Sequence, residues 1–138
     1  MTPEGAVKSA DRTLKLLELF AGEADGMSLA DVSARTGWPK SSTLALLRTL
    51  LHRDYLDVTS IDGKYRLGPR VASLGSAYLG SLSLAREGAD VVRDVSRACD
   101  ETVHLAVLQG RDVLYIAKEE GGGSMRMVST VGRMIPAH

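Results

Sequence analysis

Hydrophobic and polar positions follow two different periods along this chain. In several long stretches the apolar residues recur every three or four positions, as on one face of an α-helix. In shorter runs they alternate with polar residues or cluster between turn residues, as in β-strands. The predicted helices span residues 7–20, 28–36, 40–52, 69–80 and 84–100. The predicted strands span residues 55–58, 64–67, 103–108, 113–117 and 125–131. This order of elements predicts an α+β fold.

Two of the predicted helices carry an apolar face that we expect to be buried. In the first helix this face consists of Val7, Ala10, Leu14, Leu17 and Phe20. In the last helix it consists of Ala85, Ala89, Val92 and Val95. We therefore expect the first helix to pack behind the next two, and the last to open a second domain.

The second and third predicted helices are joined by a turn of only a few residues. Ser28 is a good N-cap for the second helix. Gly37 suits the left-handed residue that ends it, and Pro39 suits the start of the third. In that third helix, the residues spaced to face the core are Thr43, Leu46, Leu47 and Leu50. Those left outside are Ser41, Ser42, Ala45 and Arg48.

A small hairpin follows this helix pair. Asp62-Gly63 is a hairpin-turn signal between two short alternating runs. Lys64 and Arg66 lie two positions apart, so both are expected on the same side of the second strand. Two helices joined by a tight turn and followed by a hairpin form a winged helix-turn-helix.

Such an arrangement suits DNA recognition, because an α-helix fits the major groove and its N-terminal residues come closest to the base edges. Basic side chains and hydroxyl groups at the helix start and on the wing are then the expected contacts. The candidate DNA-binding residues are Lys40, Ser41, Ser42, Thr43, Ala45, Arg48, Lys64 and Arg66. The alternative is a protein-interaction module, since winged helices also serve as docking surfaces.

Charge composition does not decide between these alternatives. The chain has 17 Lys and Arg against 17 Asp and Glu, so a strongly basic footprint is missing. DNA affinity would then depend on a few well-placed cations and on doubling of the site in a dimer.

Several motifs, in this order along the chain, resemble one protein family. They are Val7-Lys8-Ser9-Ala10-Asp11-Arg12, Gly37-Trp38-Pro39-Lys40-Ser41-Ser42, Gly63-Lys64-Tyr65-Arg66-Leu67-Gly68-Pro69-Arg70 and Glu101-Thr102-Val103-His104-Leu105-Ala106-Val107. From Val7 to His138 the chain resembles the isocitrate lyase regulator (IclR) family of bacterial transcription factors. It departs from the family at Leu44 and Ala45, where relatives often carry His or Tyr and then Arg.

The resemblance implies a sequence-specific transcriptional regulator that binds a pseudo-palindromic operator as a homodimer or homotetramer under control of a small-molecule effector. It implies a winged helix-turn-helix domain over 6–68, with the helix-turn-helix at 28–53 and the wing at 55–67. A linker helix would follow over 69–83, and the effector-binding domain would begin at 84 and be incomplete at 138. We expect a truncated chain, in which effector-binding residues cannot be assigned.

Enzyme, cofactor and metal chemistry find little support in the sequence. Cys99 is the only cysteine, which excludes an internal disulfide and a multi-thiolate metal site. Gly121-Gly122-Gly123-Ser124 lacks the Lys-Ser/Thr of a phosphate loop, and His104 is expected to be an interior polar residue. The sequence shows neither a signal peptide nor a membrane-spanning run, so we expect a cytoplasmic protein with no membrane partner.

Overall fold

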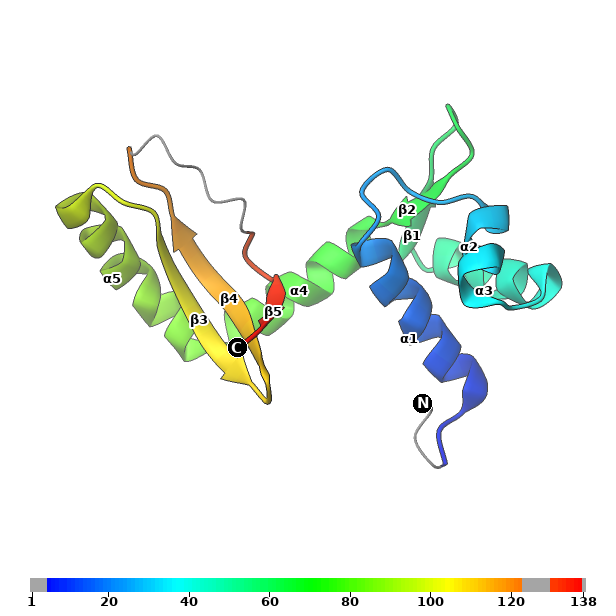
Figure 1. Ribbon diagram of the computed structural model, residues 1–138, viewed down its shortest axis with the longest axis horizontal. Coiled ribbons are helices and arrows are strands. Elements are labelled where there is room, and N and C mark those ends of the chain that lie inside the picture. Colours follow the sequence, from blue (N-terminus) through cyan, green and yellow to red (C-terminus); the bar gives the residue numbers. More distant parts are fainter. Residues whose placement is uncertain (1–4, 123–129, 138) are drawn as a thin grey trace. The chain divides into compact units, whose positions relative to one another are not determined.

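The structure is a computed structural model that describes residues 5–122 and 130–137. It divides into two compact units, Met1–Leu74 and Gly75–His138 (Figure 1). The strand predicted over 125–131 falls almost wholly outside the described residues. Among the described helices, none is both long and apolar enough to cross a bilayer.

The first unit consists of three helices followed by a two-stranded antiparallel hairpin (Figure 1). Its elements are α1 Lys8–Ala21, α2 Leu29–Thr36, α3 Lys40–His52, β1 Leu56–Val58 and β2 Tyr65–Leu67. In the hairpin Leu56 pairs with Leu67, and Val58 pairs with Tyr65. α3 contacts α1, α2 and β1, and α1 also contacts β2. α3 is therefore at the centre of this unit.

One hydrophobic core joins these elements. Its buried members are Leu16, Phe20, Met27, Val32, Leu47, Leu50 and Leu56. The apolar face predicted for α1 was partly wrong, because Val7 is 67% exposed and Leu14 is 60% exposed. Leu16 and Phe20, four residues apart, are the buried pair instead. The run of apolar residues near the end of α1 allows more than one stripe, and packing against α3 and β2 selects this one.

Helix α4, Pro69–Ser81, starts directly after the hairpin. Over its whole length no residue is buried, although Leu74 and Tyr78 are large and apolar. The apolar spacing that predicts this helix therefore does not correspond to a buried face among the described residues.

The second unit contains α5 Ser83–Cys99 and an antiparallel sheet with the strand order β3-β4-β5. The strands are β3 Val103–Gln109, β4 Asp112–Glu119 and β5 Met134–Pro136. α5 lies against β3 and β4 (Figure 1) and buries Gly88, Val92 and Ser96. The prediction that Val95 faces inward was wrong, because it is 46% exposed. β5 was not predicted from the sequence, because it is only three residues long.

Candidate nucleic-acid interface

Helix α2 begins with a reciprocal cap between Ser28 and Asp31. The Asp31 N–H donates to Ser28 Oγ at 3.2 Å, and the Ser28 N–H donates to Asp31 Oδ2 at 2.9 Å. The Ser28 hydroxyl also donates to the same carboxylate at 2.7 Å. The hydroxyl and backbone hydrogen bonds from Ser28 lower the pKa of Asp31. Two N–H groups that a helix start leaves unpaired are thus satisfied.

The turn between α2 and α3 is fixed by side-chain hydrogen bonds. Gly37 has a φ of 68°, and its N–H donates to the Ser33 carbonyl. The Ser33 hydroxyl donates to the Trp38 carbonyl at 2.6 Å, while the Thr36 hydroxyl accepts from the Trp38 N–H at 3.3 Å. Because these bonds anchor both ends of the turn, they set the direction in which α3 leaves it.

The outward face of α3 carries most of the residues proposed from the sequence. Lys40, Ser41, Ala45 and Arg48 are exposed. Ser42 is half-buried, and its hydroxyl donates to the Pro39 carbonyl at 3.0 Å. Among the described residues no side chain caps the start of α3. Its first N–H groups are therefore available to an anion, which the helix dipole also favours.

Thr43 does not belong to this face. Its exposed fraction is 0%, and its hydroxyl donates to the Pro39 carbonyl at 3.0 Å. The same spacing that places Leu47 and Leu50 in the core turns Thr43 inward. The sequence-based assignment of Thr43 to the DNA-binding set is therefore corrected: it is a core residue.

The two basic residues of the wing differ in their bonding. The Arg66 guanidinium donates to Asp62 Oδ2 at 2.9 Å and to the Asp25 carbonyl at 3.1 Å. Lys64 lies just before β2 rather than within it, and no ion pair of its side chain occurs among the described residues. Arg66 therefore helps to hold the wing, and DNA contact by either residue stays a prediction.

Asp62 organises the tip of the wing. Its carboxylate accepts from the Thr59 hydroxyl and from the Lys64 N–H, in addition to its ion pair with Arg66. The hydrogen bond from Thr59, followed by that from Lys64, lowers the pKa of Asp62. The wing turn is therefore closed by its own side chains.

One basic residue beside this face was missed by sequence reasoning. Arg12 of α1 is half-buried, and its Cζ atom lies 4.7 Å from the centre of the Trp38 ring. This is a cation–π contact, which places the guanidinium beside the start of α3. Lys8 and Arg12 are four residues apart, so their spacing on one side of a helix was the available signal.

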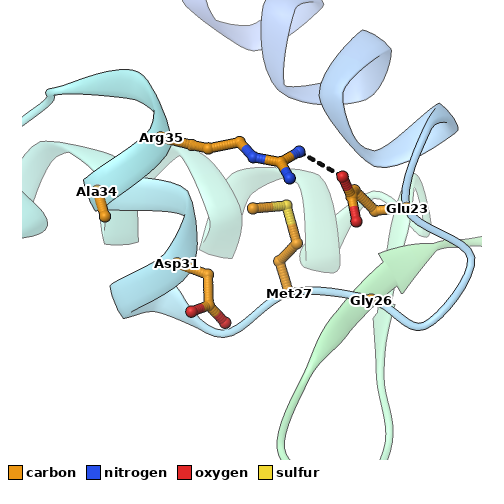
Figure 2. Close-up of a pocket in the computed structure, with 6 residues that line it drawn as sticks. All are labelled: Glu23, Gly26, Met27, Asp31, Ala34 and Arg35. Carbon is orange, nitrogen blue, oxygen red and sulfur yellow. Dashed lines mark hydrogen bonds and ion pairs between the residues drawn. The ribbon is translucent and has the colours of Figure 1, made fainter.

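A depression of about 460 Å³ lies between α2 and the loop that precedes it. Its lining residues are Glu23, Gly26, Met27, Asp31, Ala34 and Arg35 (Figure 2). Arg35 reaches across to Glu23 in an ion pair, as Figure 2 shows. Two carboxylates against one guanidinium, already paired, do not suit a phosphate. No group of His, Cys, Asp or Glu residues in the described ranges could hold a metal ion.

The three helices and hairpin define the first unit as a winged helix-turn-helix, a class of nucleic-acid-binding fold. Two sequence profiles of a single family match the chain. The IclR helix-turn-helix domain matches residues 9–59, and the bacterial transcriptional regulator IclR C-terminal domain matches residues 76–138. The chain therefore belongs to the IclR family of bacterial transcriptional regulators. The predicted family and fold class are confirmed, and the family consists of regulators rather than enzymes.

Individual relatives agree with this assignment. The HTH-type transcriptional regulator XynR of Escherichia coli K12 is 34% identical over 132 residues, covering 96% of this chain and 52% of that protein. The glycerol operon regulatory protein of Streptomyces coelicolor is 30% identical over 132 residues, with the same coverage of 96% and 52%.

A solved structure is similar over the same extent. The crystal structure of an IclR homologue from Microbacterium hydrocarbonoxydans, complexed with 4-hydroxybenzoate, matches with a TM-score of 0.77 at 26% identity. The match covers 95% of this chain and 54% of that one. The chain thus spans about half the length of the relatives it matches.

Proposed function

We propose that this chain binds double-stranded DNA in a sequence-selective way through α3, as the DNA-binding part of a transcriptional regulator. The observation that carries the proposal is the division of α3 into two faces. Thr43, Leu47 and Leu50 are buried, whereas Lys40 and Ser41 at its start and Arg48 further along are exposed. A helix anchored on one side and polar on the other can enter a major groove without unfolding its core.

The exposed residues of α3 divide by chemistry. Lys40 and Arg48 suit backbone phosphates, and the Ser41 and Ser42 hydroxyls suit phosphates or base edges. Ala45 has no donor, so its methyl group suits the methyl of a thymine. Lys64 provides a cation on the wing for the flanking backbone. We propose that these residues, without Thr43 and with Arg66 in a structural role, make the DNA contacts.

Control of this binding is proposed to follow the family plan. Two copies would place their α3 helices in successive major grooves of a pseudo-palindromic operator. A small-molecule effector would act on the second unit, as the 4-hydroxybenzoate complex of the Microbacterium relative supports. We propose domain limits of 6–68 and 84–138, with a linker over 69–83. The proposed place of action is the bacterial cytoplasm, where the DNA lies.

The test begins with selection of duplexes from a random-sequence pool by the purified chain. Fluorescence anisotropy of an enriched duplex and of a scrambled duplex, at several salt concentrations, then measures affinity and its salt dependence. We expect tighter binding to the enriched duplex and a steep slope, about 0.9 in log–log units for each phosphate neutralised. Arg48→Ala should weaken binding, whereas the control Arg93→Ala, in the other unit and paired with Asp90, should not.

Two other results would contradict the proposal. If no duplex is enriched, the protein-interaction alternative is favoured. Binding of a partner protein through an apolar contact would respond little to salt. If Arg48→Ala leaves both affinity and salt slope unchanged, the exposed face of α3 is not the contact surface.

A further inference from the structure

A groove of about 490 Å³ runs between the start of α1 and the outward face of α3. Its lining residues from the α1 side are Val7, Lys8, Ser9 and Arg12. Those from α3 are Ser42, Ala45 and Leu46. The groove therefore adjoins the helix face proposed above to enter the major groove of DNA.

Among the residues that the structure describes, the charged side chains that line this groove have the same sign. Lys8 and Arg12 are cations, and the described residues that line the groove include no carboxylate. Within the described ranges neither of them forms an ion pair, whereas Arg35 and Arg66 each hold a carboxylate. Two uncompensated cations on one wall of a groove favour an anion there.

Arg12 is held in place rather than free in solvent. Its Cζ atom lies 4.7 Å from the centre of the Trp38 ring, and the Trp38 backbone is held in turn by hydrogen bonds to the Ser33 and Thr36 hydroxyls. A guanidinium over an aromatic ring still has N–H donors for an oxygen acceptor. Ala45, which also lines the groove, has only a methyl group and leaves room in it.

We propose that this groove is a binding site for the DNA backbone, in which Lys8 and Arg12 contact phosphate next to the bases that α3 reads. Trp38 is the positioning residue for Arg12. Phosphate contacts of this kind fix the register of a recognition helix without carrying sequence information themselves. This inference rests on the proposed function and extends the contact surface from α3 and the wing to α1.

Three glutamine variants of α1 test the site. Lys8→Gln and Arg12→Gln each remove one cation from the groove. Lys15→Gln is the matched control, since Lys15 lies on the same helix, is paired with Asp11 at 2.8 Å and does not line the groove. Binding of the enriched duplex and of a mixed-sequence duplex is measured against salt. Each groove variant should reduce the slope by about 0.9 for a lost phosphate contact on both duplexes, and the control should not.

The positioning role of Trp38 has a separate readout. Trp38→Phe keeps an aromatic face for the guanidinium and should keep the wild-type salt slope. Trp38→Leu removes that face and should show the reduced slope of Arg12→Gln. Circular dichroism of each variant checks that the fold is retained. Because Lys8 is exposed, Lys8→Gln tests the groove without disturbing the packing of Trp38.

A chemical change in the DNA locates the contact. Replacing single phosphates of the enriched duplex with neutral methylphosphonates should weaken wild-type binding at a particular backbone position. The same replacement should have no further effect on Arg12→Gln. If wild type binds with a steep salt slope but Lys8→Gln and Arg12→Gln leave that slope unchanged, the groove site is refuted and the proposed function stands. If wild type binds no duplex, both are refuted.

Discussion

Gly68 packs directly against the main chain of Asp54. A Cβ atom on Gly68 would lie 2.4 Å from the Asp54 carbonyl oxygen. The Gly68 N–H donates to the Tyr55 carbonyl at 2.8 Å, and the Arg70 N–H donates to the Asp54 carbonyl at 3.1 Å. Asp54 itself has a φ of 60°. The end of the wing and the end of α3 are therefore fixed to each other by backbone contacts that leave no space for a side chain.

Gly68→Ala should destabilise the first unit by about 1–3 kcal/mol, because a methyl group there must displace backbone. Gly75→Ala is the matched control, since a Cβ at Gly75 meets nothing within 4 Å. That change should leave the stability of the first unit within about 0.5 kcal/mol of wild type, because Gly75 lies in the second unit. Urea unfolding followed by Trp38 fluorescence reports on the first unit, because Trp38 is the only tryptophan of the chain. Equal stabilities of the Gly68 variant and wild type would contradict the close packing.

The stability of the first unit should fall in acid because of two carboxylates. Hydrogen bonds from Ser28 lower the pKa of Asp31, and those from Thr59 and Lys64 lower the pKa of Asp62. Each carboxyl therefore has a lower pKa in the folded state than in the unfolded state. Its contribution to the free energy of unfolding is complete above the ordinary carboxyl pKa of about 3.9, and it is lost as the pH falls through the folded-state pKa. Asp31→Asn and Asp62→Asn should each flatten this acid dependence of the urea midpoint. An unaltered pH profile in both variants would show that these hydrogen bonds do not stabilise the fold.

Thr43 and Ser41 should separate folding from DNA binding. Thr43→Val removes a buried hydroxyl that donates to Pro39, so it should cost about 1 kcal/mol of stability and leave the salt slope of DNA binding intact. Ser41→Ala changes an exposed position, so stability should stay within about 0.5 kcal/mol while DNA affinity falls. Unfolding and anisotropy titrations on the same preparations measure both quantities. A reduced salt slope with unchanged stability for Thr43→Val would place Thr43 at the interface.

Arg66 should contribute to the stability of the wing, and Lys64 to DNA binding. Arg66→Gln removes the ion pair with Asp62 and the bond to the Asp25 carbonyl, so the midpoint of unfolding should fall. Lys64→Gln removes a cation without an ion pair among the described residues, so it should reduce the salt slope of DNA binding with little effect on unfolding. If the two variants behave alike in both assays, Arg66 and Lys64 do not have separate roles in stability and DNA binding.

The sequence by itself determined the local elements of this protein. Ser28 and Asp31 cap α2 through hydrogen bonds that span three residues, and Gly37 ends that helix in the left-handed region. The turn at Asp62-Gly63 lies where its residues predicted a hairpin. Features of this kind depend on neighbours within one helical turn or one hairpin, so residue order is sufficient to predict them.

Tertiary structure decided which faces and partners those elements use. It selected Leu16 over Leu14 for the core, because α3 and β2 pack against one side of α1. It assigned Arg66 to the carbonyl of Asp25, 41 residues away, and brought Lys8 and Arg12 to the edge of α3. Such contacts join residues far apart in the chain, so they depend on how helices pack rather than on local spacing. The DNA-binding role of α3 therefore stays a prediction, and packing adds Lys8 and Arg12 beside it as cations that local spacing did not assign to the same surface.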